Sequence, residues 1–163
     1  MNDEFFVDTN ILVYAFDESE KPKRIIAKKI IEEVTKGNAI GFISNQVLAE
    51  FFVALTKKIE NPLNKTDAEA IVNGFIDSVH WKKINYSDQT VSKAIETSIK
   101  TNSHFWDALI AEAMLENKIY VLLTENTKDF KCEHIKTINP FKSWTKINKK
   151  RVKINLKTKQ TTN

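Results

Sequence analysis

The sequence predicts an α/β protein of three layers (α/β/α), in which a parallel sheet of four to five strands lies between helices. Short apolar segments such as 5–7 and 119–123 alternate with longer segments in which apolar residues recur every three or four positions. The first pattern is typical of strands buried on both faces, and the second of amphipathic helices. Their alternation favours parallel strands joined by crossover helices. With 163 residues and 42% hydrophobic content, the chain can form one such core.

Start and stop signals delimit the elements of the first half of the chain. Pro22 opens an isoleucine-rich helical pattern that Gly37 closes. Ser44 or Asn45 can cap the next helix, which Pro62 ends. The expected order is strand 5–7, helix 22–36, strand 39–43, helix 45–59, and helix 66–76, whose start (Thr66, Glu69) has capping-box spacing.

The second half repeats the alternation. Ser87 and Ser103 can each cap a helix. The aromatic residues Phe51, Phe105 and Trp106 fall among apolar neighbours, so we expect them in the core. The expected order is strand 81–84, helix 87–99, helix 103–114, strand 119–123 and strand 135–138.

The charge of the chain is unevenly distributed. From Lys142 to Asn163 there are eight Lys or Arg residues and no acid, which leaves 17 basic and 21 acidic residues in 1–141. We therefore expect residues 1–141 to form the folded domain and 142–163 to be a basic tail that is disordered or loosely packed.

The cellular setting is suggested by what the sequence contains. Its single cysteine, Cys132, cannot form an internal disulfide, which fits a reducing compartment. No apolar run approaches the roughly 20 residues of a membrane span, and the acidic first residues do not resemble a secretory signal. We expect a cytoplasmic protein that does not contact a membrane.

Acidic residues occur at four places that the predicted topology brings to one edge of the sheet. Asp8 follows the first strand, and Glu50 lies early in the helix after the second. Asp107 lies in the first turn of the helix that leads to the fourth strand, and Asp129 follows that strand together with Glu125 and Asn126. Because ligand sites of open α/β sheets form at the carboxyl ends of the strands, this edge is the candidate site.

Four carboxylates in one place require compensation. Neighbouring carboxylates raise one another's pKa or bind a cation. Oxygen ligands without a His or Cys cluster favour Mg²⁺ or Mn²⁺ over zinc, and such ions commonly serve phosphate chemistry. Taken singly, each acid could equally be a helix cap, a macrodipole partner or a solvated loop residue. Their joint placement is what indicates a metal site.

Four motifs in order resemble those of the PIN domain family. They are Asp8-Thr9-Asn10-Ile11-Leu12-Val13-Tyr14, Ser44-Asn45-Gln46-Val47-Leu48-Ala49-Glu50-Phe51, Phe105-Trp106-Asp107-Ala108-Leu109-Ile110 and Leu123-Thr124-Glu125-Asn126-Thr127-Lys128-Asp129-Phe130, the last followed by Ile138-Asn139-Pro140-Phe141. The resemblance extends from about Phe5 to Phe141 and is closest to the VapC-like toxins of toxin–antitoxin pairs. It implies a PIN-like fold and a metal-dependent endoribonuclease whose activated water leaves a 5′-phosphate and a 3′-hydroxyl.

The resemblance also assigns roles to individual residues. It implies that Asp8, Glu50 and Asp107 bind Mg²⁺ or Mn²⁺, with Thr9, Asn10 and Thr124 as supporting polar groups. The fourth motif departs from the commonest pattern, since Asn126 stands where many members have Asp. Asp129 is then expected to supply the fourth carboxylate, with Asn126 assisting. An RNA substrate, an antitoxin partner and a homodimer are implied in the same way.

Three other interpretations remain open. A catalytically silent PIN module would bind RNA or a protein without cleavage, and Asn126 favours it. A PIN nuclease of RNA processing or decay would lack an antitoxin. The Asp8-Thr9-Asn10 sequence also has a faint similarity to haloacid-dehalogenase phosphatases, but these need a second acid where this chain has Asn10.

Overall fold

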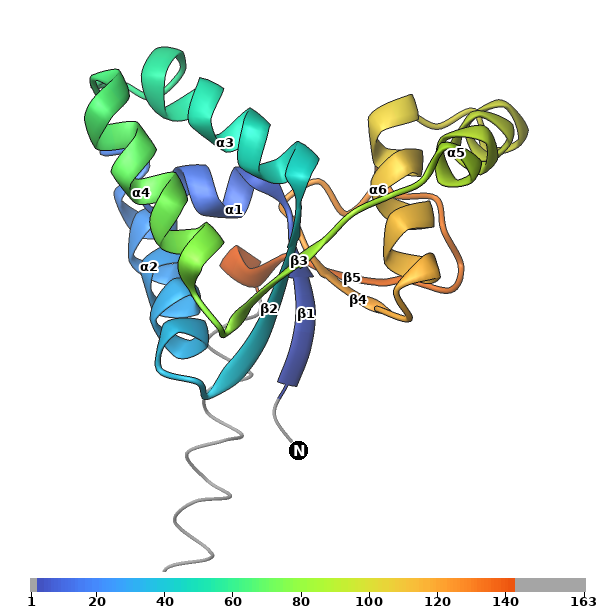
Figure 1. The fold of residues 1–163 in the computed structure, drawn as a ribbon, viewed down its shortest axis with the longest axis horizontal. Coiled ribbons are helices and arrows are strands. Elements are labelled where there is room, and N and C mark those ends of the chain that lie inside the picture. The colour runs from blue at the N-terminus through green and yellow to red at the C-terminus, as the bar shows by residue number, and fades with distance from the viewer. Residues whose placement is uncertain (1–2, 143–163) are drawn as a thin grey trace, which may run out of the picture.

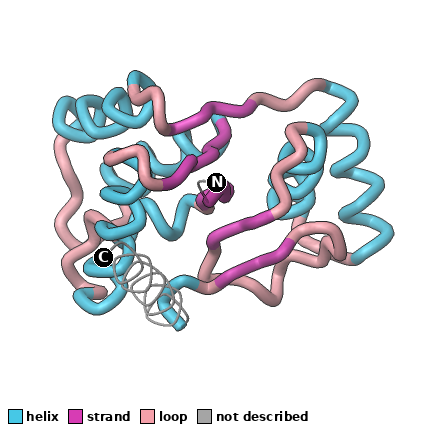
Figure 2. Tube along the Cα trace, turned by 90° about the horizontal axis from the view of Figure 1, so that it is seen from below, coloured by secondary structure: helices cyan, strands magenta, loops and turns pink. Residues whose placement is uncertain are grey.

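The computed structural model describes residues 3–142, which form a parallel sheet between two helical layers (Figure 1). The strand order is β3-β2-β1-β4-β5, and every pairing is parallel. Helices α1 to α4 cover one face and α5 and α6 the other, and the view from below shows the strands running between them (Figure 2). In chain order the elements are β1 (Asp3–Val7), α1 (Thr9–Tyr14), α2 (Lys21–Thr35), β2 (Ala39–Ser44), α3 (Asn45–Lys57), α4 (Lys65–Asp77), β3 (Trp81–Ile84), α5 (Asp88–Thr101), α6 (Phe105–Glu116), β4 (Val121–Leu123) and β5 (Lys136–Ile138). The predicted three-layer fold with a parallel sheet is confirmed.

Two of the helix caps expected from the sequence are confirmed. Ser44 and Ser87 cap α3 and α5 as expected, each accepting a hydrogen bond from a backbone N–H. Helix α4 instead begins one residue earlier than expected, because Asn64 accepts the bond from Asp67. Helix α6 begins after His104, whose side chain makes no capping bond, so the expected Ser103 cap is wrong.

Helix α1 is the element that the sequence does not predict. It spans six residues, directly after β1. A single turn and a half is too short to show a hydrophobic period. Its buried residues, Ile11 and Leu12, place it in the core rather than in a surface loop.

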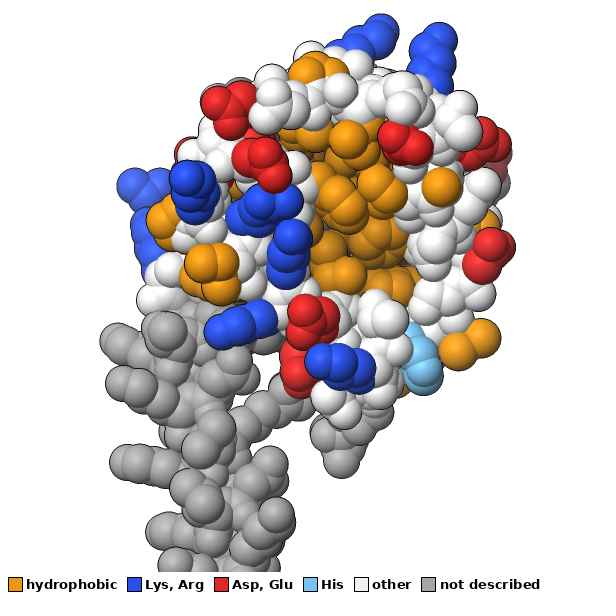
Figure 3. Space-filling model, turned by 90° about the vertical axis from the view of Figure 1, so that its left-hand side faces the viewer, with side chains coloured by type: hydrophobic (Ala, Val, Ile, Leu, Met, Phe, Trp, Pro, Cys, Tyr) orange, Lys and Arg blue, Asp and Glu red, His pale blue; other side chains and the backbone are white. Residues whose placement is uncertain are grey.

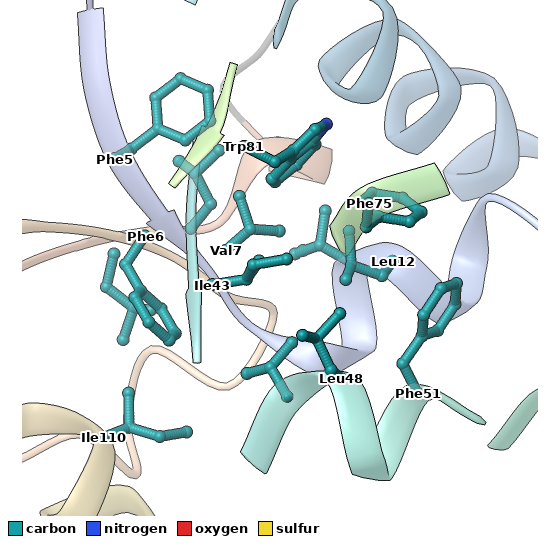
Figure 4. Close-up of a cluster of buried hydrophobic side chains, with 14 of the residues drawn as sticks. Phe5, Phe6, Val7, Leu12, Ile43, Leu48, Phe51, Phe75, Trp81 and Ile110 are labelled. Carbon is teal, nitrogen blue, oxygen red and sulfur yellow. The ribbon is translucent and has the colours of Figure 1, made fainter. Parts of the chain in front are cut away.

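The core is built around β1, the central strand. Successive side chains of a strand point to opposite faces, so Phe6 faces one helical layer while Phe5 and Val7 face the other. In Figure 4, Phe6 lies toward Ile110 of α6. On the other face, the rings of Phe75 and Trp81 meet edge to face with centroids 5.0 Å apart. Both faces of β1 are therefore buried, as the apolar run predicts.

Two sequence predictions fall at the limits of the described residues. Of the expected basic tail 142–163, only Lys142 belongs to the described part. Within residues 3–142, no helix has the length and apolarity to cross a bilayer.

The contact between β2 and β3 gives a stability prediction. A Cβ added at Gly41 would lie 2.7 Å from Cζ3 of Trp81, the residue paired with it across the sheet. Trp81 is buried and cannot move freely. Gly41→Ala is therefore expected to lower the free energy of unfolding by about 1–3 kcal/mol, measured by urea denaturation.

Gly74→Ala is the matched control. Gly74 lies inside α4, and an added Cβ would meet nothing within 4 Å. The substitution should raise the free energy of unfolding by about 0.5–1 kcal/mol, because it restricts the unfolded chain. Equal effects of the two substitutions would contradict the close packing of Gly41 against Trp81.

Candidate active site at the carboxyl edge of the sheet

Asp8 occupies the centre of the carboxyl edge. It follows β1, which pairs with β2 on one side and β4 on the other. Its backbone N–H donates to the carbonyl oxygen of Leu123, the last residue of β4, at 3.0 Å. The side chain of Asp8 therefore begins at the point where β1 and β4 end together.

Two polar side chains hold the Asp8 carboxylate in one orientation. Oδ2 of Asp8 accepts a bond from Nδ2 of Asn10 and another from the hydroxyl of Thr124, each 2.6 Å long. Thr124 is fully buried, and its hydroxyl oxygen accepts the backbone N–H of Asn126 at 3.1 Å. Because an ionised carboxylate can only accept, the hydroxyl proton of Thr124 is directed to Asp8. The motifs around Asp8 and Thr124 thus form one hydrogen-bonded unit.

The environment of Asp8 favours its neutral form. Burial raises the pKa of Asp8 from 3.8 to about 6, although the bonds from Thr124 and from the backbone of Thr9 oppose this rise. The negative charges of Glu50 and Asp107 raise the pKa further. No Lys, Arg or His within residues 3–142 forms an ion pair with Asp8. The carboxylate is therefore partly desolvated and faces like charge.

Glu50 reaches the edge from the second turn of α3. Its Oε2 accepts the hydroxyl proton of Thr9, and its Oε1 accepts a bond from Nε2 of Gln46, both at 2.8 Å. Thr9 joins Glu50 to α1, which begins beside Asp8. Gln46 was not singled out from the sequence, although it lies four residues before Glu50 on the same helical face, a spacing that could have indicated it.

Asp107 reaches the edge from α6 in the other helical layer, and Asp129 from the loop that follows β4. Burial raises the pKa of Asp107; His104 opposes this rise, while the charges of Asp129 and Glu50 add to it. The loop that carries Asp129 is attached to the C-terminus of α5 by Lys131, whose Nζ donates to the carbonyl oxygens of Thr101 and Asn102 at 3.3 and 3.1 Å. The four predicted acids are thus electrically coupled across the two layers.

The remaining residues of the fourth motif have different surroundings. Asn126 is exposed, and its backbone rather than its side chain bonds Thr124. Glu125 is turned to other partners: its Oε1 lies 2.8 Å from Nζ of Lys23, and its Oε2 accepts the hydroxyl proton of Tyr14 at 2.5 Å. Both oxygens of Glu125 are used, so it does not join the group of acids.

Trp106 is a correction to the expected core. Phe51 is fully buried and Phe105 partly so, but Trp106 is 49% exposed. Its ring meets that of Phe105 edge to face, with centroids 5.2 Å apart. Helix α6 is apolar on nearly all sides, so the pattern alone did not reveal which aromatic residue faces solvent.

The chemistry of the acids fits a hard divalent cation, because all four are oxygen donors and burial and mutual charge raise the pKa of two of them. The four acidic side chains do not lie close enough together to coordinate one ion. Within residues 3–142, no three Asp, Glu, His or Cys side chains are grouped closely enough to hold a metal ion. Protein donors already bond Oδ2 of Asp8 and both carboxylate oxygens of Glu50. Glu50 is exposed and can leave its two partners by rotation.

Comparison with known proteins identifies the architecture. The family model described as PIN domain matches residues 5–131. A toxin–antitoxin complex from Klebsiella pneumoniae is similar at 21% identity and a TM-score of 0.59, covering 83% of this chain and 96% of that chain. The sarcin-ricin loop cleaving toxin VapC20 of Mycobacterium tuberculosis has 15% identity and a TM-score of 0.60, covering 80% of this chain and 98% of that one. DNA-bound VapBC from Salmonella typhimurium has 18% identity and a TM-score of 0.58, covering 85% and 98%. No curated protein matches the sequence.

The raised pKa of Asp8 predicts how stability changes with pH. Below pH 3.8 the carboxyl is protonated in both states; between about pH 4 and 6 the unfolded chain loses the proton while the folded protein keeps it. The free energy of unfolding of the metal-free protein therefore falls as the pH rises from about 4 to 6. Asp8→Asn should raise the free energy of unfolding in EDTA by on the order of 2–3 kcal/mol at pH 7.5, but by less than about 1 kcal/mol at pH 4.

Urea denaturation at the two pH values measures this difference. Glu69→Gln, an exposed residue of α4, is the control and should behave as the parent at both. An Asp8→Asn effect of the same size at pH 4 and pH 7.5 would show that Asp8 is not desolvated.

Proposed function

The chain belongs to the PIN domain family, and from this we propose that it is a Mg²⁺- or Mn²⁺-dependent endoribonuclease, the toxin of a type II toxin–antitoxin pair. The observation that carries the proposal is the placement of acids from four separate segments, in which the charges of Glu50 and Asp107 raise the pKa of Asp8 and those of Asp129 and Glu50 raise the pKa of Asp107. Carboxylates that raise one another's pKa at the ligand-binding edge of an α/β sheet support metal-assisted phosphate chemistry more than a structural role.

The residues of this edge divide into ligands and supports. Asp8, Glu50, Asp107 and Asp129 would hold the ion, which when bound lowers the pKa of a coordinated water and offsets charge on the phosphodiester. Asn10 and Thr124 fix the orientation of Asp8, and Thr9 donates a hydrogen bond to Glu50. Asn126 keeps Thr124 in place through its backbone.

RNA cleavage by purified variants tests the site. The parent is expected to cleave RNA with Mg²⁺ or Mn²⁺ and to lose activity in EDTA. Asp8→Asn and Asp107→Asn should each lower kcat/KM by about 100-fold or more, because each removes a charge from the ligand set.

Glu69→Gln controls for the loss of one negative charge elsewhere on the surface. Metal-dependent cleavage at the parental rate by both Asp variants would show that the active site does not lie at this edge of the sheet.

A hydrophobic surface supports the proposal of a protein partner. Figure 3 shows a broad hollowed area of hydrophobic side chains on the face that carries α2 and α4, bordered by charged residues. Helix α2 contributes Ile26 and Ile31 and helix α4 contributes Ile71, all partly buried against the core. Apolar areas of this kind commonly mark protein-binding sites. Since similar folds occur in toxin–antitoxin complexes, we assign this face to an antitoxin. The protein is further proposed to act in the cytoplasm as a homodimer.

Co-purification tests the partner. The product of the adjacent reading frame, co-expressed with this chain, is expected to bind it and inhibit cleavage. Ile71→Glu should weaken that complex by about tenfold or more, because it places a charge in the apolar face. Ile99→Glu, on exposed α5 in the other layer, should leave it unchanged. Unchanged binding by Ile71→Glu would show that the partner binds another surface. The absence of an antitoxin-like reading frame next to this one would favour an RNA-processing or decay nuclease.

A catalytically silent module is the second candidate. It is favoured by one observation: Glu50 has both oxygens bonded within the protein. Titration calorimetry with Mn²⁺ separates the two functions. Millimolar or tighter binding that is lost in Asp8→Asn supports the nuclease, and no binding supports the silent module.

A further inference from the structure

A cluster of three side chains, Tyr14, Lys23 and Glu125, joins two helices to the end of β4. Nζ of Lys23 in α2 lies 2.8 Å from Oε1 of Glu125 and donates to the hydroxyl of Tyr14 in α1 at 3.0 Å. The Tyr14 hydroxyl donates in turn to Oε2 of Glu125. Each member therefore contacts the other two.

This cluster is more constrained than an ordinary surface ion pair. The side chains of Lys23 and Glu125 are 24% and 27% exposed. The Lys23 ammonium also lies 4.3 Å from the centre of the Tyr14 ring, which packs against Phe141. Exposed pairs contribute little because both side chains remain mobile. Here the tyrosine fixes both charged ends.

The cluster is connected to Asp8 through a single residue. The backbone N–H of Glu125 donates to Oδ1 of Asn10 at 3.3 Å, and the carbonyl of Glu125 accepts Nδ2 of Asn139 at 3.1 Å. A side-chain amide has one acceptor oxygen, so holding Oδ1 against Glu125 turns Nδ2 of Asn10 toward the Asp8 carboxylate. The position of Glu125 thereby selects the orientation in which Asn10 supports Asp8.

We propose that Lys23 is a positioning residue of the active site: by anchoring Glu125, it sets the Asn10 amide that orients Asp8. Lys23 touches neither substrate nor metal in this assignment. The inference rests on the proposed function for its effect on cleavage, but its geometric part concerns the metal-free protein alone.

The first test measures geometry without metal. In the parent, the Glu125 amide should be protected from hydrogen exchange, and the Asn10 side-chain amide should give one sharp pair of NMR signals. Lys23→Met should lower Glu125 protection by about tenfold and shift the Asn10 signals. Lys23→Arg, which keeps the charge, should restore both. Lys36→Met is the matched control, because Lys36 forms only an exposed pair with Glu32 at 3.3 Å.

The second test measures function. Lys23→Met should weaken Mn²⁺ binding and lower kcat by about fivefold to tenfold, with KM for RNA within twofold of the parent, since supporting partners of ligands typically act on affinity and rate. Glu125→Gln should have a similar effect, and Lys23→Arg a smaller one.

The outcomes separate the two hypotheses. If Lys23→Met alters the Asn10 and Glu125 signals but the parent neither binds Mn²⁺ nor cleaves RNA, the positioning geometry is upheld and the nuclease is rejected. A Lys23→Met protein with a lower melting temperature but parental Asn10 signals, Mn²⁺ affinity and kcat would show that Lys23 is merely structural, and would overturn the inference.

Discussion

The partial burial of Asp8 at the end of the central strand is the constraint on which the site depends. Parallel pairing of β1 with β2 and β4 places this carboxylate between two neighbouring strand ends, where water has limited access. A buried charge must be hydrogen-bonded, paired or neutralised. Asn10 and Thr124 provide two bonds, yet the pKa of Asp8 still stands at about 6. The fold thus maintains a carboxylate that a cation would stabilise.

The order of the elements brings the other acids to the same edge of the sheet, and the surroundings of Asp8 and Glu50 differ. Helix α3 begins at the same edge because it follows β2, and α6 begins there because it must return the chain to the start of β4. Asp8 is fixed by a fully buried threonine, whereas Glu50 is exposed and bonded to side chains alone. Because Glu50 is exposed and Asp8 is not, rotation of Glu50 would let the site adapt to an ion while Asp8 keeps its place.

The direction of the strands explains why Asp8 and the segment after β4 could be expected from the sequence to meet at one edge of the sheet. Once β1 and β4 are parallel, residues that follow them must meet, so Asp8 and Thr124 come together whatever the loops do. Contacts between side chains of distant segments do not follow from strand direction. Lys23 and Glu125 lie about a hundred residues apart on a helix and a loop, and only packing brings them together. The exposure of Trp106 depends equally on how α6 is rotated against the sheet. The pattern of residue types along the chain specifies neither the packing that joins Lys23 to Glu125 nor the rotation of α6.

The two outer strands have a consequence for assembly. β3 and β5 are only four and three residues long, and their exposed side chains include Lys82, Lys83 and Lys136. Short edge strands that carry lysine side chains disfavour pairing with a strand of another molecule. Continuation of the sheet into a neighbouring molecule is therefore disfavoured on both flanks, which protects the protein against fibril-like stacking and leaves the helical layers as the surfaces through which it can associate.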